Sequence, residues 1–128
     1  MNEFIFELRN MDYYREMGGV SKSVINEAEN ILDLKFSNEY SEYLEMCGTA
    51  TADGHEFTGL GRSQRLSVVA VTEKNRKINN NIPKGLYVIE ELGIDRIVIW
   101  QSVSGEIYQT VGDSKPDKIA ESIAEYLK

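Results

Sequence analysis

The chain has 128 residues and a formal net charge of −7, with 41% hydrophobic and 27% charged residues. These values are ordinary for one globular domain with one core, and no apolar run reaches the ~18 residues of a membrane span. An acidic chain repels phosphates, so the composition disfavours direct binding to nucleic acid.

The ends and the cysteine content predict a cytoplasmic protein. The first residues lack the basic region and the long apolar region of a signal peptide. Cys47 is the single cysteine, which excludes a disulfide within the chain.

Three amphipathic helices are predicted in the N-terminal half. The first covers residues 3–15, belongs to a helical extension at 1–19, and ends at Gly18 and Gly19. The second and third cover residues 24–32 and 38–46, and serines precede both as caps. Their apolar stripes consist of Val24, Ile25, Ala28, Ile31 and Leu32, and of Tyr40, Tyr43, Leu44 and Cys47.

After Gly48 the helical spacing of apolar residues gives way to loop and strand patterns. Residues 49–55 read as a polar loop, 57–60 as a short strand, and 66–70 as strand or extended chain. Thr72 is a competent cap for a short middle helix that ends at the asparagines 79–81.

Strands dominate the remainder. Residues 86–89, 96–101 and 106–111 are predicted strands, the last two forming a hairpin. A final helix is expected from Ser114 or Lys115 to residue 127, with Pro116 in its first turn. The predicted fold class is α+β, with N-terminal helices packed on a curved antiparallel sheet, a short middle helix and a C-terminal helix.

Signals of catalysis or metal binding are weak. His55 is the one histidine and is interpreted as a surface loop residue, and Cys47 as a buried small hydrophobe. A small enzyme that uses a Cys47–His55 dyad stays open as an alternative, but we expect no enzyme, no cofactor and no metal. Gly59 and Gly61 lack the companions of a phosphate loop and read as backbone bends.

Carboxylates give the strongest candidate site. Glu39, Glu42 and Glu45 fall opposite the apolar stripe of the helix at 38–46, with no basic residue between them. Residues 1–56 hold 12 acids and 4 bases, a net of −8, whereas residues 57–128 have a net of +1. We therefore predict partner binding by this acidic ridge and by the acidic loop at Asp53 and Glu56.

Short motifs in a fixed order resemble the SUKH superfamily. They begin with Ile25-x-x-Ala28-Glu29-x-x-Leu32, Tyr40-x-x-Tyr43-Leu44 and Cys47-Gly48. They continue with Glu56-Phe57-x-Gly59, Ile82-Pro83-x-x-Leu86, Gly105-Glu106-Ile107-Tyr108 and a similar closing helix near Tyr126-Leu127. The resemblance covers about residues 20 to 128. Phe36-Ser37 stands where the family has Leu-Pro, which alters only a corner.

The resemblance implies an immunity protein. Such a protein binds and neutralises a cognate bacterial toxin domain in the cytoplasm, often a nuclease, by stoichiometric association. The chain is similar to Bacillus-type members that are paired with toxins carrying an LXG export region. A regulatory protein-interaction module that is unconnected to a toxin is the alternative.

Overall fold

The computed structural model describes residues 2–128 and contains five helices and seven strands over that range. The helices are α1 (Glu3–Arg9), α2 (Lys22–Leu32), α3 (Asn38–Met46), α4 (Val68–Ile78) and α5 (Ile123–Tyr126). The strands are β1 (Arg15–Glu16), β2 (Ala50–Ala52), β3 (His55–Glu56), β4 (Tyr87–Glu91), β5 (Ile97–Gln101), β6 (Ile107–Val111) and β7 (Asp117–Ala120). The predicted α+β class is confirmed.

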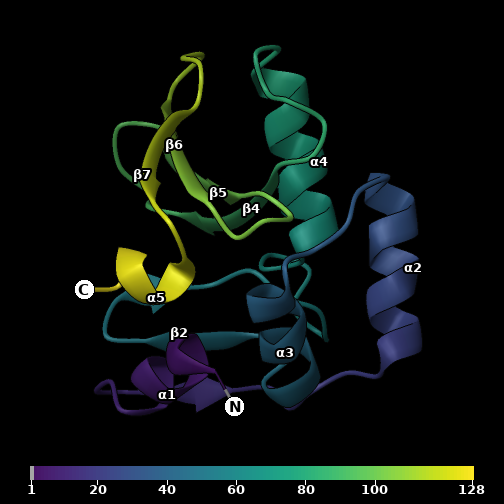
Figure 1. Cartoon of the computed structure of the whole chain (residues 1–128), viewed down its shortest axis with the longest axis vertical. Helices are drawn as coiled ribbons and strands as arrows, with labels where there is room; N and C mark the ends of the chain where they lie inside the picture. The colour runs from purple at the N-terminus through teal and green to yellow at the C-terminus, as the bar shows by residue number, and fades with distance from the viewer. Residues whose placement is uncertain (1) are drawn as a thin grey trace.

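The strands form two antiparallel sheets. The order is β1-β2-β3 in the small sheet and β4-β5-β6-β7 in the larger one. The large sheet and α4 occupy one end of the molecule, and α1 with the small sheet occupies the other (Figure 1). The three strands predicted at 86–111 are β4, β5 and β6, within one or two residues at their ends.

Serine caps fix the starts of α2 and α3 as predicted. The Ser21 hydroxyl accepts a hydrogen bond from Val24 N at 3.4 Å, and Ser37 does the same for Tyr40 N at 3.0 Å. Such caps satisfy amides that the helix itself leaves unpaired. Helix α3 then buries its whole predicted stripe, from Tyr40 to Cys47.

The first helix is shorter than the predicted 3–15. It ends at Arg9, and Asn10 closes it by donating a side-chain hydrogen bond to the Phe6 carbonyl at 2.9 Å. Tyr13 then adopts a positive φ of 62°, which turns the chain into β1. Phe4, Ile5 and Leu8 are fully buried, so α1 is part of the main core.

The loop predicted at 49–55 contains a β-hairpin instead. Asp53 and Gly54 both have positive φ and form the turn between β2 and β3, since Asp-Gly suits the tight hairpin turn. The strand predicted at 57–60 is wrong as well, because only isolated bridges of Phe57 and Gly59 form there.

Helix α4 begins before the predicted Thr72. Ser67 caps it by accepting from Ala70 N at 3.2 Å, and Val68, Val71, Thr72 and Asn75 form its buried face. The strand preference of the valines was outweighed by the tertiary burial that this helical spacing allows.

The C-terminal helix is also shorter than predicted. Residues 117–120 form β7 beside β6, and the helix starts only after Ser122, whose hydroxyl accepts from Glu125 N at 3.0 Å. The prediction from Ser114 was wrong because pairing with the edge of β6 is a long-range contact that local helix signals do not report. Ile119 is consequently exposed rather than buried.

Two hydrophobic clusters lie on opposite faces of the large sheet. Ile99 and Tyr87 point into the main core with α1, α2, α3 and α5, whereas Val98 and Trp100 point to the α4 side. A β-bulge at Ile89, between Val88 and Glu90, breaks the alternation in β4. It directs Glu90 to the main-core face and Glu91 toward α4.

Candidate protein-binding surface

The three ridge carboxylates have different surroundings. Glu39 is half-buried and its carboxylate accepts from the backbone amides of Ile123 at 2.8 Å and Ala124 at 3.1 Å. It also accepts from Gln101 Nε2 at 2.9 Å. Glu39 therefore closes the N-terminus of α5, a role that nothing near it in the sequence signals.

Glu42 and Glu45 remain available to a partner. Glu42 is half-buried and Glu45 exposed, and neither has an ion pair or side-chain hydrogen bond within residues 2–128. Two like charges three residues apart on a helix repel slightly. The absence of a compensating cation leaves their charge unneutralised by the fold.

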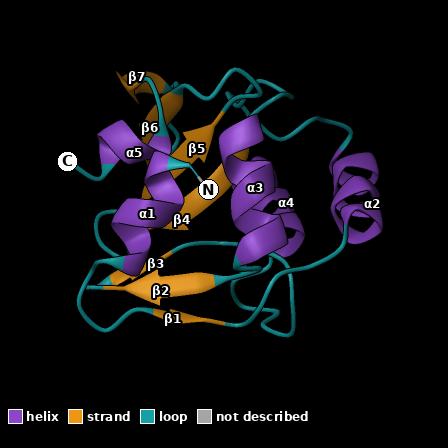
Figure 2. Ribbon diagram, turned by 60° about the horizontal axis from the view of Figure 1, so that its bottom comes forward, coloured by secondary structure: helices purple, strands orange, loops and turns teal. Residues whose placement is uncertain are grey.

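Helix α3 lies beside α1, and the two helices form a seam (Figure 2). Asn2 donates to the Glu39 carbonyl at 3.1 Å, the rings of Phe4 and Tyr43 lie 5.1 Å apart, and Arg9 reaches the Cys47 sulfur at 3.9 Å. Because positions 39, 43 and 47 follow α1, the neighbouring row of positions 42 and 46 borders the seam on its solvent side.

Two large apolar side chains are exposed on these two helices. Phe6 of α1 is 57% exposed and Met46 of α3 is 37% exposed. Aromatic residues and methionine are enriched where proteins bind one another. The helical pattern already placed Phe6 opposite the buried stripe of α1, and that signal could have identified it from the sequence.

More carboxylates lie where α1 meets α5. Lys128 pairs with Glu3 at 2.9 Å, and this hydrogen bond raises the pKa of Lys128, with further attraction from Glu7 and Glu125. We define the α1–α3 face as exposed or half-buried residues of α1, α3 and the adjacent α5. They are Glu3, Phe6 and Glu7 of α1, Glu42, Glu45 and Met46 of α3, and Glu125 of α5. The face combines acidic groups with an exposed aromatic ring and a flexible thioether.

The other two predicted residues lie on the β2–β3 hairpin. Asp53 is exposed at the turn. Glu56 is held by Arg65 in a two-pronged ion pair at 2.9 and 2.7 Å, and this bond lowers the pKa of Glu56. The structure thus brings Glu56 together with a cation rather than with Glu42 and Glu45.

Cys47 and His55 do not form a dyad, because each is bonded to a different residue. The Cys47 sulfur is buried and accepts from Tyr14 at 3.4 Å, and burial raises the pKa of the thiol. His55 Nδ1 bonds to the buried Glu90 at 3.0 Å, while its ring stacks on Phe57. Within residues 2–128, no group of three or more His, Cys, Asp or Glu side chains is placed to hold a metal ion.

A comparison with protein-family models matches the chain over its whole length. The SUKH_5 family model, described as SMI1-KNR4 cell-wall, matches residues 1–128. The chain belongs to this SMI1-KNR4, or SUKH, family, which confirms the resemblance seen in the motifs. The family is associated with immunity proteins.

A solved structure supports the same fold. It is the crystal structure of a protein from Pseudomonas syringae pv. tomato, which superposes with a TM-score of 0.76 at 15% identity. The match covers 98% of this chain and 94% of that chain. A search of curated proteins gave no match. In the part of the chain that the structure describes, no helix has the length and apolarity needed to span a membrane.

Proposed function

We propose that this protein is an immunity protein that binds a cognate bacterial toxin domain in the cytoplasm and neutralises it by stoichiometric association. The observation that carries the proposal is the α1–α3 face, where Glu42 and Glu45 lack ion pairs within residues 2–128 and accompany exposed Phe6 and Met46. Membership of a family associated with immunity proteins supports the same role.

The chemistry of this face favours a basic partner. Unneutralised carboxylates attract cations over about 10 Å at 0.1 M salt and steer a basic surface toward the complex. A nuclease domain fits, because it must itself be basic to hold nucleic acid. The exposed aromatic and thioether groups would supply the desolvated centre of the contact, and the carboxylates its rim.

A protein that neutralises a toxin by staying bound to it does not need to catalyse any reaction. We therefore propose that the protein has no enzymatic activity of its own and contacts the toxin rather than nucleic acid. Protection should saturate at a fixed molar ratio of the two proteins, whereas a catalytic antidote would act in trace amounts.

The test begins with co-purification from the native cell and identification of the bound protein. The identified protein is then expressed without this chain, where it should be toxic, and with it, where growth should recover. A bound protein that is harmless when expressed alone would exclude the immunity role and favour a regulatory interaction module.

Matched charge variants test the surface. The double variant Glu42→Lys/Glu45→Lys should slow association and reduce protection, while leaving Glu39 and its hydrogen bonds intact. The control Glu27→Lys/Glu73→Lys makes the same charge change at exposed glutamates of α2 and α4. Equal loss in both pairs would mean that only net charge matters, and no loss in either would exclude the α1–α3 face.

A further inference from the structure

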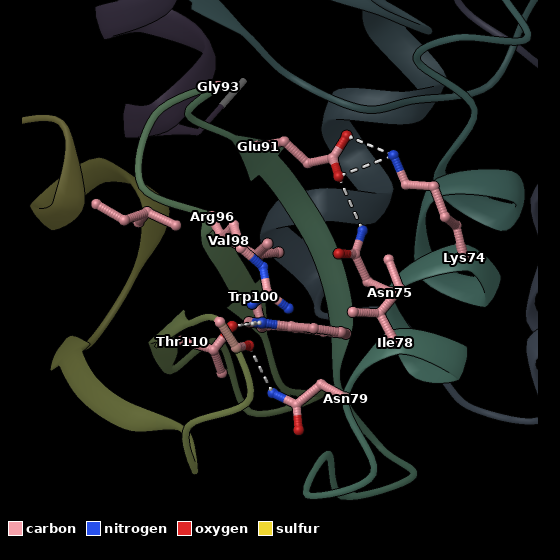
Figure 3. A pocket seen from close by; sticks show the side chains of 12 residues that line it. Lys74, Asn75, Ile78, Asn79, Glu91, Gly93, Arg96, Val98, Trp100 and Thr110 are labelled. Atoms are coloured by element: carbon pink, nitrogen blue, oxygen red, sulfur yellow. Dashed lines mark hydrogen bonds and ion pairs between the residues drawn. The ribbon is translucent and has the colours of Figure 1, made fainter.

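A pocket of about 320 Å³ lies between α4 and the face of the large sheet that α4 only partly covers (Figure 3). Most of its lining residues belong to α4 and the large sheet. These elements lie at the end of the molecule away from α1 and the small sheet (Figure 1). The apolar lining of the pocket consists of Trp100 and Val98 of β5, which are 1% and 9% exposed, and of the exposed Ile78 of α4. Ligand pockets typically combine such apolar walls with a few fixed polar groups.

The pocket follows from how α4 meets the sheet. Val71, Asn75 and Ile78 share one side of α4, at intervals of four and three residues. Val71 is buried against the sheet, but Ile78, one turn beyond Asn75, is 52% exposed. Helix α4 packs mainly along β4, so its C-terminal turn leaves the space above β5 and β6 unfilled.

Hydrogen bonds hold the walls in place. The Asn79 amide donates to the carbonyls of Gly112 at 3.3 Å and Ser114 at 2.9 Å, which ties α4 to the end of β6. The Trp100 indole donates to Thr110 at 3.0 Å and is fixed in its plane. A preformed pocket binds a ligand without the cost of ordering its own side chains.

Each of the two cations at the rim pairs with a carboxylate of the protein. Glu91 already accepts from Lys74 at 3.2 Å and from Asn75 at 3.0 Å (Figure 3). The Arg96 side chain is exposed and, within residues 2–128, bonds only to Asp113 at 3.3 Å. A guanidinium has five N–H donors, so Arg96 retains the capacity to bind a second carboxylate.

We propose that this pocket binds a small amphipathic carboxylate. Its apolar ring or branched chain would lie against Trp100, Val98 and Ile78, and its carboxylate would bond to Arg96. The pocket is at the small end of ligand sites, and its rim offers one guanidinium with spare donors rather than the several donors that a nucleotide requires. This inference is independent of toxin binding.

Trp100 is the single tryptophan of the chain, so its indole N–H gives one signal in a proton–nitrogen NMR spectrum that reports on the pocket directly. We would titrate the full chain with 1-naphthylacetate and, in parallel, with the neutral 1-naphthaleneethanol. The expected result is a saturable shift of the Trp100 signal with naphthylacetate and about tenfold weaker binding of the neutral compound, because it lacks the charge-assisted hydrogen bond.

Two variants locate the interaction. Arg96→Gln should weaken naphthylacetate binding about tenfold and leave the neutral compound unaffected. Ile78→Glu should abolish binding of naphthylacetate, whereas Val103→Glu, also at an exposed apolar residue but outside the pocket, should not.

Three outcomes would overturn the proposal. They are the absence of a saturable shift, equal affinity for the two compounds, and unchanged naphthylacetate binding in Arg96→Gln. The comparison of the two compounds on the unaltered protein gives a decision even if Ile78→Glu folds poorly.

Discussion

Replacing Glu39 by alanine should destabilise the protein far more than replacing its neighbour on the ridge, Glu42. The Glu39 carboxylate accepts from the first two amides of α5, and Ser122 accepts from the third. Alanine would leave the Ile123 and Ala124 amides without their acceptor and would also remove one of the two acceptors of the buried Gln101 NH₂ group, which keeps the Gly105 carbonyl.

The expected cost follows from these contacts. Loss of a helix cap typically costs about 1 kcal/mol, and loss of an acceptor for a buried amide adds about 1 to 2 kcal/mol. A total of about 2 to 3 kcal/mol corresponds to a fall in the melting temperature of roughly 7–11 °C for a chain of this size. Glu42→Ala should change the free energy of unfolding by less than about 0.5 kcal/mol.

Urea unfolding followed by circular dichroism measures both variants. Glu39→Gln is the intermediate case, because its amide oxygen can accept one hydrogen bond while its NH₂ group opposes the second backbone amide. If Glu39→Ala is as stable as Glu42→Ala, the hydrogen bonds to α5 contribute no net stability and the reasoning fails.

Further predictions concern the titration of His55, the reactivity of Cys47 and the space available for a side chain at Gly59. The bond to Glu90 raises the pKa of His55, so the stability that this pair contributes is fully present below the unfolded pKa of about 6.5 and is lost as pH rises through the raised folded value. Wild type should therefore exceed His55→Gln in melting temperature by more at pH 5.5 than at pH 9; a constant difference would contradict this linkage. Cys47 should react with a thiol reagent only at the rate of unfolding, because the thiol is buried, and rapid labelling of the native protein would exclude that placement. Gly59→Ala should yield little folded protein, since a Cβ there would lie 2.0 Å from a backbone carbonyl oxygen, whereas Gly85→Ala, with no atom within 4 Å, should fold normally; equal yields would refute the close approach.

Local signals were sufficient where local chemistry decides the structure. The serine caps and apolar spacing predicted α2 and α3, and β-branched runs predicted β4 to β6. The hairpin of β2 and β3 carried a recognisable Asp53-Gly54 turn, but its strands are only two or three residues long and too short for an alternating pattern.

Long-range contacts account for what the sequence did not predict. Ile123 lies 84 positions from Glu39, and no periodicity links a glutamate of α3 to the amides of α5. The same limit applies to the ridge, whose geometry on α3 was predicted but whose first member proved to be engaged within the fold. The family match shows the fold and the family, and the binding role of Glu42, Glu45, Asp53 and Glu56 stays a prediction.

The bulge at Ile89 decides which of two consecutive carboxylates of β4 faces which side of the large sheet. One inserted residue sends Glu90 to His55 and Tyr126 on one face and Glu91 to Lys74 and Asn75 on the other. If these residues paired in regular alternation without the bulge, Glu90 would turn toward α4 and Glu91 toward the main core, and each carboxylate would lose its present donors. A single offset in the strand therefore lets these two neighbours serve both ends of the molecule, while the fully buried Ile89 side chain fills the main core at the same point.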